Sequence, residues 1–141
     1  MAGHSGTPLV KKLGIKDGFH VAILGAPDGF AETLGSLPPG TTVQTDREGA
    51  PCQVVVFFTT EREELARSLA ELRTRIVPEG GLWIAWPKRS SGVATDLTED
   101  AVRTLALAHR LVDNKVCAID EIWSGLRLVI RLRDRPKKRR S

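Results

Sequence analysis

Three stretches of the chain, residues 19–27, 52–60 and 81–87, are almost continuously apolar and end in turn residues. Each is rich in β-branched or aromatic side chains and lacks the polar alternation of a strand that faces solvent. Such runs are typical of strands buried on both faces, as in a parallel sheet that helices cover. The pattern therefore predicts the centre of a parallel α/β sheet.

The segment between the second and third runs has the spacing of an amphipathic helix, with apolar positions at Leu65, Leu69, Leu72 and Ile76. Charged residues occupy the opposite side of this predicted helix. We expect Pro78 and the glycines Gly80 and Gly81 to end it. A strand, a helix and a strand in this order predict a right-handed parallel crossover.

Shorter elements flank this unit. A short helix is expected at residues 29–37, and a second strand at residues 41–45. After Pro87, a basic loop leads to another helix with an apolar stripe. We place the start of that helix at Asp96, because Asp96 and Glu99 form the D-x-x-E pattern of a capping box.

The last apolar stretch alternates, unlike the first three. Apolar residues at positions 126, 128, 130 and 132 are separated by Arg127, Val129, Arg131 and Arg133. Alternation predicts a strand with one solvent-facing side. Its short connection to the run at residues 112–120 permits only an antiparallel hairpin. We expect this hairpin to form the edge of the sheet, with the arginines preventing pairing with another chain.

These elements predict a single three-layer α/β domain over residues 1–133. Its sheet is expected to be Rossmann-like and mostly parallel, with an antiparallel C-terminal hairpin strand. Residues 134–141 are expected to be a disordered basic tail. The last eleven residues contribute +6 to a net charge of +4, so the remaining chain carries −2. The basic character therefore belongs to the tail.

Composition limits localisation and metal chemistry. No apolar run approaches the ~18 residues of a membrane-spanning helix, and the first residues lack the apolar core of an export signal, so we expect a cytoplasmic protein with no membrane partner. Cys52 and Cys117 lie in apolar runs, and we interpret them as buried reduced thiols. The histidines and cysteines lack the spacing of metal ligands, so no metal site is predicted.

Several blocks of sequence are distinctive: "KKLGIKDGFHVAILGAPDGF", "VPEGGLWIAWPK" and "GVATDLTEDAV" followed by "LVDNKVCAIDEIWSGLRLV". Together they resemble a bacterial family catalogued as domain of unknown function 3052, over residues 9–131. This resemblance implies no established activity.

The order of elements is also similar to a trimmed class I methyltransferase. The first run and its glycine turn resemble the opening of that superfamily, "PEGG" resembles the turn before its fifth strand, and the hairpin resembles its antiparallel seventh strand. Only residues 46–51 separate the second strand from the next, where a full methyltransferase has another strand and helices. We therefore expect a smaller sheet.

Ligands of doubly wound sheets bind outside the carboxyl ends of the strands, where strand order reverses. We expect this crevice to lie between the glycine turn, the residues after the second run and the loop after Pro87. The methyltransferase resemblance implies S-adenosylmethionine as a candidate cofactor, although Pro27 stands where a third glycine is expected. A plain strand-to-helix turn is the alternative. The candidate binding residues are Gly25, Ala26, Pro27, Gly29, Asp46, Thr59, Lys88, Ser90 and Asp96.

The loop after Pro87 has two interpretations. Two cations and two hydroxyls at residues 88–91, followed by a helix N-terminus, are typical of an anion site. Asp96, Glu99 and Asp100 would repel an anion there, which favours a solvated loop.

No nucleophile and base occur in a recognisable arrangement. We therefore favour a non-catalytic or degenerate methyltransferase-like domain that binds an unknown small molecule or protein. One alternative is an enzyme that depends on S-adenosylmethionine or a nucleotide and uses the predicted crevice. Another is a nucleic-acid-associated protein, whose basic residues from Arg135 to Arg140 make weak nonspecific phosphate contacts.

Overall fold

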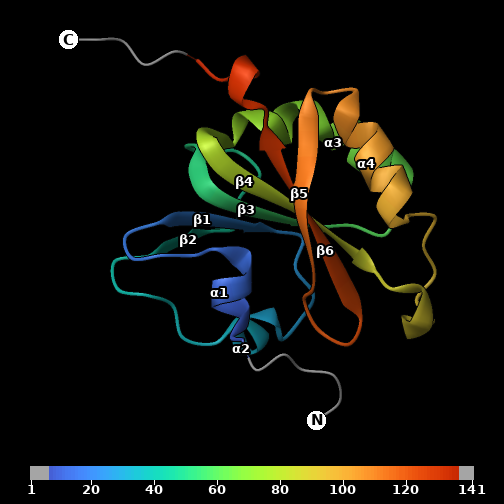
Figure 1. Ribbon diagram of the computed structural model, residues 1–141. Coiled ribbons are helices and arrows are strands. Elements are labelled where there is room, and N and C mark those ends of the chain that lie inside the picture. The colour runs from blue at the N-terminus through green and yellow to red at the C-terminus, as the bar shows by residue number, and fades with distance from the viewer. Residues whose placement is uncertain (1–6, 137–141) are drawn as a thin grey trace.

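The computed structural model describes residues 7–136, which form a six-stranded sheet between two layers of helices (Figure 1). This architecture confirms the predicted three-layer α/β fold. The strands are β1 His20–Leu24, β2 Thr42–Gln44, β3 Cys52–Phe58, β4 Ile76–Pro87, β5 Leu111–Ala118 and β6 Trp123–Ile130. The helices are α1 Leu9–Leu13, α2 Phe30–Leu34, α3 Arg62–Thr74 and α4 Glu99–Leu107, with the 3₁₀ turns η1 Arg89–Ser91 and η2 Leu132–Asp134.

The sheet has the strand order β2-β1-β3-β4-β6-β5, and every strand except β6 runs in the same direction. The three apolar runs are neighbours: Val21 pairs with Val54, and Val55 pairs with Leu82, in parallel register. Their carboxyl ends therefore meet at one edge of the sheet, here called the carboxyl edge, and their starts meet at the amino edge. In the described part of the chain no strand lies outside β2, as the short connection after it led us to expect.

The C-terminal hairpin enters the sheet differently from the prediction. β6 lies between β4 and β5, so the expectation that the arginine-bearing strand forms the edge was wrong. The edge strand on this side of the sheet is β5, whose pairing is irregular between Asp113 and Lys115. An irregular, charged edge discourages pairing with another chain. β6 ends at Ile130, and Leu132, which was expected to continue its apolar face, is 79% exposed.

The glycine pair after α3 also has a different role from the predicted one. Residues 76–87 all belong to β4, so Pro78, Gly80 and Gly81 lie within a strand and do not end the helix. The register between β3 and β4 shifts at this point, so β4 bulges. A Cβ on Gly80 would lie 2.9 Å from the carbonyl oxygen of Gln53. Glycine is therefore needed for the close approach of the two strands.

Each face of the sheet buries its own apolar cluster. α3 and α4 cover one face, and α1 and α2 cover the other (Figure 1). Trp83 is fully buried beneath α1, and its indole N–H donates to the Leu13 carbonyl at 3.1 Å. This bond satisfies the polar end of the ring and ties α1 to the sheet. Because α1 and α2 have only five residues each, they leave parts of their face uncovered.

The short connection from β2 to β3 is fastened by a buried arginine. Arg75 is 3% exposed, and no ion pair in the described part of the chain involves it. Charge buried in this way is costly unless hydrogen bonds satisfy it. The Arg75 guanidinium donates to the backbone carbonyls of Asp46, Arg47 and Ala50 and to the side-chain oxygen of Gln44.

Three remaining expectations concern single features. No helix among residues 7–136 is long and apolar enough to cross a membrane. Both cysteines are free thiols, but only Cys52 is fully buried, whereas Cys117 is half-buried. Residues 137–140 of the expected basic tail lie outside the described residues; Arg135, just before them, donates to the Ile130 carbonyl.

Candidate functional site

The glycine turn follows β1 at the carboxyl edge. Gly25 has φ +70°, and a Cβ at this position would lie 3.0 Å from the Phe58 carbonyl oxygen. Both features exclude a side chain here. Gly29 has φ +84° and directly precedes α2, so a second glycine redirects the chain into the helix. The turn is thus set by the packing of β1 against β3.

Four predicted site residues line one cavity of about 620 Å³ beside this turn, here called the turn cavity. It lies at the carboxyl edge of β1, on the face that α2 covers only partly. Nearly all the side chains that line it are apolar; Thr45 alone among them has a polar side-chain atom. The walls come from the turn (Gly25, Ala26, Pro27, Gly29), from α2 (Phe30, Ala31, Leu34) and from β1, β2 and the residue after β2 (Ile23, Val43, Thr45).

Asp46 does not line the turn cavity. β2 pairs only with the first part of β1, up to Ala22, so it ends short of the glycine turn. The chain then crosses toward the amino edge, where Arg75 binds the Asp46 carbonyl and leaves the Asp46 side chain exposed. The structure therefore separates Asp46 from Gly25.

Thr59 is buried at the end of β3 and is used within the fold. Its hydroxyl accepts a hydrogen bond from the Glu61 backbone N–H at 3.1 Å and donates to the Glu64 carboxylate. These bonds satisfy groups at the start of α3, which begins at Arg62. Thr59 thus stabilises the strand-to-helix junction.

Asp96 has a different role from the predicted capping box, which was wrong. The N-cap of α4 is Thr98, whose hydroxyl accepts from the Ala101 N–H at 3.1 Å. The Asp96 carboxylate instead accepts from the Arg62 N–H at 2.7 Å. Asp96 therefore caps α3, a helix that precedes it by more than thirty residues in the sequence.

Lys88 and Ser90 lie in a separate region. Lys88 lines a cavity of about 500 Å³, the loop cavity, together with Trp86 and Glu99. Ser90 is exposed in η1 and does not line it. The Glu99 carboxylate pairs with Arg103 at 2.6 Å, and this bond is the main cause that raises the pKa of Arg103. The negative charge expected to repel an anion is thus partly neutralised.

The chemistry available in these cavities is limited. The turn cavity has no titratable side chain on its walls, so it offers no general acid, base or nucleophile. Among residues 7–136, no group of three or more His, Cys, Asp or Glu side chains is placed to hold a metal ion. The turn cavity can therefore enclose a ligand but supplies no reacting group.

A further cavity, of about 560 Å³, lies at the amino edge and was missed by the sequence analysis. We call it the basic cavity, because Lys12, Lys16, Lys115 and Arg127 line it and Glu79 is its one acidic residue. These cations come from distant parts of the sequence, and no local motif joins them. The outward arginine of an alternating strand, Arg127, was the one available signal.

Comparison with solved structures places the fold among methyltransferases. The chain is similar to a SAM-dependent methyltransferase from Aquifex aeolicus, with a TM-score of 0.63 and 16% identity over 85% of this chain and 86% of that one. It is also similar to the fibrillarin pre-rRNA processing protein of Methanococcus jannaschii, with a TM-score of 0.61 and 12% identity over 91% and 70% of the two chains. A third similar structure is a magnesium protoporphyrin IX methyltransferase from Synechocystis PCC 6803 with bound SAH, with a TM-score of 0.56 and 12% identity over 82% of this chain and 75% of that one.

No family model and no curated protein sequence matches the chain. The resemblance to the family of unknown function therefore stays a prediction. At identities this low, the structural similarity establishes a methyltransferase-like Rossmann fold and nothing about activity.

Proposed function

We propose that this protein is a non-catalytic, methyltransferase-like domain that binds a largely apolar small molecule in the turn cavity. The observation that carries the proposal is the lining of that cavity, which combines four residues of the glycine turn with apolar side chains of α2, β1 and β2. A concave, mainly apolar site at the carboxyl edge of such a sheet is where ligands bind. The absence of titratable groups on its walls favours binding over catalysis.

S-adenosylmethionine fits this site poorly. A nucleoside cofactor needs an acceptor for its ribose hydroxyls, and the candidate for that role, Asp46, lies outside the cavity. Pro27 has no N–H to offer in the turn, where backbone donors would meet the cofactor. These two features support a degenerate site.

The test uses a substitution that fills the cavity without straining the backbone. Gly25→Val is unsuitable, because Gly25 has φ +70° and no room for a Cβ. Ala31 is exposed on α2 and lines the cavity, so Ala31→Phe should block it while the domain stays folded. Ala70→Phe on the exposed side of α3 is the matched control.

The probe is indole, a neutral aromatic, titrated while the amide resonances are recorded. We expect shifts at Ala26, Gly29 and Leu34 in the original protein and in Ala70→Phe, and their loss in Ala31→Phe. Shifts confined to other residues, or none at millimolar indole, would contradict the proposal. If indole causes the same amide shifts in Ala31→Phe as in Ala70→Phe, the proposal is also contradicted.

The alternative is an S-adenosylmethionine-dependent enzyme, which the similarity in fold to a SAM-dependent methyltransferase and to a methyltransferase with bound SAH favours. Calorimetric titration separates the two functions. Cofactor at about 100 times its dissociation constant would add ~2.7 kcal/mol to the free energy of unfolding. We expect no heat and no stabilisation at millimolar S-adenosylmethionine. A measured stabilisation would replace the proposal by the alternative.

Nucleic-acid association through the tail is a third candidate. It predicts binding that weakens with salt and is lost on truncation after Pro136, a cut that retains the Arg135 contact with Ile130. Binding that survives this truncation would rule out the tail as the contact.

A further inference from the structure

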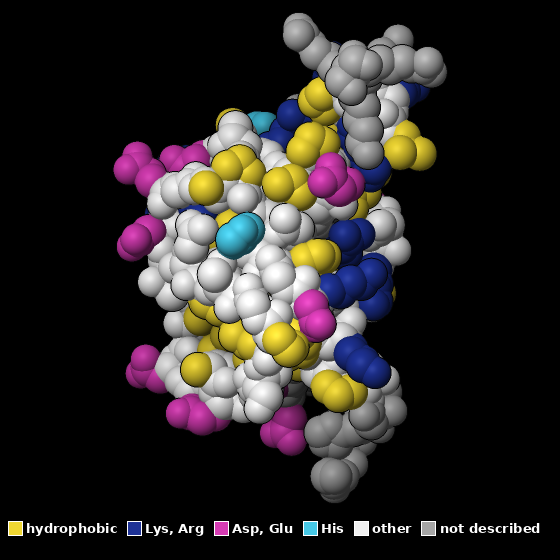
Figure 2. Space-filling model, turned by 90° about the vertical axis from the view of Figure 1, so that its left-hand side faces the viewer, with side chains coloured by type: hydrophobic (Ala, Val, Ile, Leu, Met, Phe, Trp, Pro, Cys, Tyr) yellow, Lys and Arg dark blue, Asp and Glu magenta, His cyan; other side chains and the backbone are white. Residues whose placement is uncertain are grey.

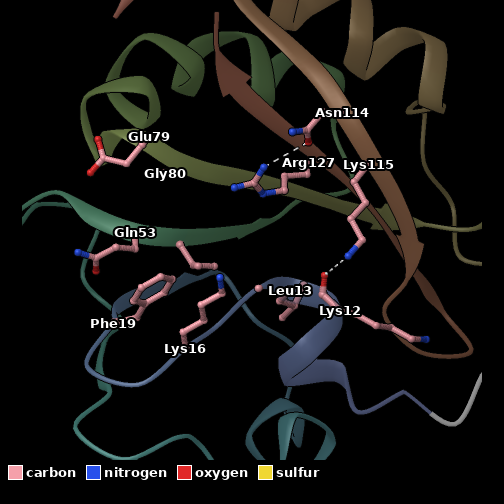
Figure 3. Close-up of a pocket in the computed structure, with 12 residues that line it drawn as sticks. Lys12, Leu13, Lys16, Phe19, Gln53, Glu79, Gly80, Asn114, Lys115 and Arg127 are labelled. Carbon is pink, nitrogen blue, oxygen red and sulfur yellow. Dashed lines mark hydrogen bonds between the residues drawn. The ribbon is translucent and has the colours of Figure 1, made fainter. Parts of the chain in front are cut away.

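The basic cavity opens beside α1 at the amino edge, away from the turn cavity. Its walls come from the loop after α1, the starts of β3 and β4 and the middle of β5 and β6 (Figure 3). Figure 2 looks onto the amino edge and shows Lys and Arg side chains gathered on the right-hand side of this face. The site thus lies on a surface that the methyltransferase resemblance does not assign.

Three cations line this hollow from different elements. In Figure 3 the Lys16 ammonium points up from the loop after α1, and the Arg127 guanidinium lies across β4 above it. Lys115 reaches down from β5 to the Lys12 carbonyl, which accepts its hydrogen bond at 3.1 Å. The Lys12 side chain points away from this group in the same view, so Lys16, Lys115 and Arg127 are the cations available to a ligand here.

These charges are not neutralised within the fold. Among residues 7–136, every ion pair involves other side chains, and neither Lys16, Lys115 nor Arg127 has a carboxylate partner. The one acidic lining residue, Glu79, is exposed and forms no ion pair in this part of the chain. Unpaired cations that converge on a hollow attract an anion of more than one charge.

Arg127 is held in place for this role by the shape of β4. A Cβ on Gly81 would lie 2.4 Å from its Nε and 2.7 Å from its Nη2, so the guanidinium lies across β4 where glycine leaves room. Its Nη1 donates to the Asn114 side-chain oxygen at 3.4 Å, a long bond to a neutral group. Burial, followed by the charge of Arg135, lowers the pKa of Arg127. A half-buried cation without a counterion gains most from an arriving anion.

We propose that the basic cavity binds the phosphate or pyrophosphate group of a small phosphorylated molecule. Lys16, Lys115 and Arg127 bind the oxygens, and Arg127 can donate two parallel bonds to them. Phe19 and Gln53 on the neighbouring wall provide an aromatic and an amide surface for the organic part. A hollow of about 560 Å³ has the size of small-molecule sites. This site is independent of the function proposed for the turn cavity.

Inorganic pyrophosphate is the probe, titrated into the full chain at low salt while the amide resonances are followed. We expect shifts at Gly80, Asn114 and the residues around Lys16. Arg127→Gln should weaken pyrophosphate binding about tenfold, since it removes a bidentate partner. Lys16→Gln should weaken it about fivefold. Because Lys16 is exposed, that variant tests the site even if Arg127→Gln unfolds.

The matched control is Arg67→Gln on α3, which removes the same charge from the other face of the sheet and should leave binding unchanged. Adenosine monophosphate and citrate are further probes. Binding of the first would indicate that the site accepts a nucleotide phosphate, and binding of the second would indicate that it accepts carboxylates. If all three substitutions weaken pyrophosphate binding equally, the effect depends only on net charge, and the proposal is overturned. Binding of an RNA oligonucleotide without any binding of pyrophosphate would also overturn it.

Discussion

The two edges of the sheet are fastened by groups of opposite character. At the carboxyl edge, the N-terminus of α3 meets the Thr59 hydroxyl and the Asp96 carboxylate. At the amino edge, Arg75 follows α3 and binds backbone carbonyls, and Lys115 donates to the carbonyl of Lys12 near the end of α1. Acceptors thus fasten one edge and cations the other.

Helix direction explains most of this difference. A helix carries partial positive charge at its N-terminus and partial negative charge at its C-terminus. In a parallel crossover the helix starts at the carboxyl edge and returns to the amino edge, so each edge favours one sign of charge. Helix direction does not explain Lys16, which follows α1 in a loop, or Arg127, which lies on β6. Among residues 7–136, Lys16 and Arg127 are bound to no helix terminus, so they can bind the proposed anion, and the Lys115 ammonium has two further N–H groups for the same purpose.

The strongest test of this comparison removes the arginine that fastens the amino edge. Arg75→Met leaves three backbone carbonyls without their donor, and we expect the free energy of unfolding to fall by about 3 kcal/mol. Urea denaturation measures it. Arg67→Met, an exposed arginine on α3, should change stability by less than about 0.5 kcal/mol. If both variants are equally stable, Arg75 does not fasten this edge.

A second test asks whether Gly81 exists to make room for Arg127. Gly81→Ala places a methyl 2.4 Å from the Arg127 Nε, so the flexible arginine side chain must move, and we expect a loss of about 1 kcal/mol in stability. In an Arg127→Ala background the clash is absent, so the same substitution should cost less than about 0.5 kcal/mol. Urea denaturation of the four proteins closes this double-mutant cycle. Equal costs in the two backgrounds would show that the two residues are not coupled.

The carboxyl edge has its own test in the cap of α3. Asp96→Ala removes the acceptor of the Arg62 N–H and should cost about 1 kcal/mol, which is the usual value of such a cap. Asp96→Asn keeps an acceptor at the same place and should retain most of that stability. Thermal unfolding provides the measurement. If Asp96→Asn loses more stability than Asp96→Ala, the capping role of Asp96 is contradicted.

The smallest predicted effect is a change in the reactivity of Cys117, which depends on nearby cations of the basic cavity. Burial raises the pKa of the Cys117 thiol, while the charges of Lys12 and Lys115 lower it less. Because the folded protein holds this proton to higher pH than the unfolded chain does, stability should fall as pH rises through the thiol range. Removing a nearby cation should raise the pKa further, so Lys115→Gln should slow alkylation of Cys117 at pH 8.

The alkylation rate, followed by mass spectrometry against pH, measures this shift; Cys52 is fully buried and serves as an internal reference. Lys11→Gln, which alters a lysine that is not among the causes of the Cys117 shift, is the control. If the pH profile of Cys117 alkylation is unchanged in Lys115→Gln, the charge of Lys115 does not influence the pKa of Cys117.

Much of the fold follows from local pattern. The three apolar runs predicted adjacent parallel strands, and Val21, Val54 and Val55 occupy them as expected. What failed depended on partners distant in sequence. Alternation identified β6 as a strand with one polar side but could not show that it inserts between β4 and β5. The glycines before Leu82 have the sequence of a helix end, yet a strand bulge has the same need for glycine.

The candidate site was predicted in part. Gly25 and Pro27 line the expected cavity because their places follow directly from the end of β1. Asp46 does not, because its position depends on Arg75, almost thirty residues later. Asp96 was recognised as a cap, but the helix that it caps lies earlier in the chain and shares no local pattern with it.

Arg75 has one more consequence, for the way the domain opens. The Cys52 amide donates to the Arg75 carbonyl at 2.7 Å, and the Arg75 amide donates to the Leu72 carbonyl at 2.9 Å. The start of β3 and the last turn of α3 are thus joined through a single residue. Their amide protons should exchange with solvent through one cooperative event of shared free energy, so that neither segment frays alone.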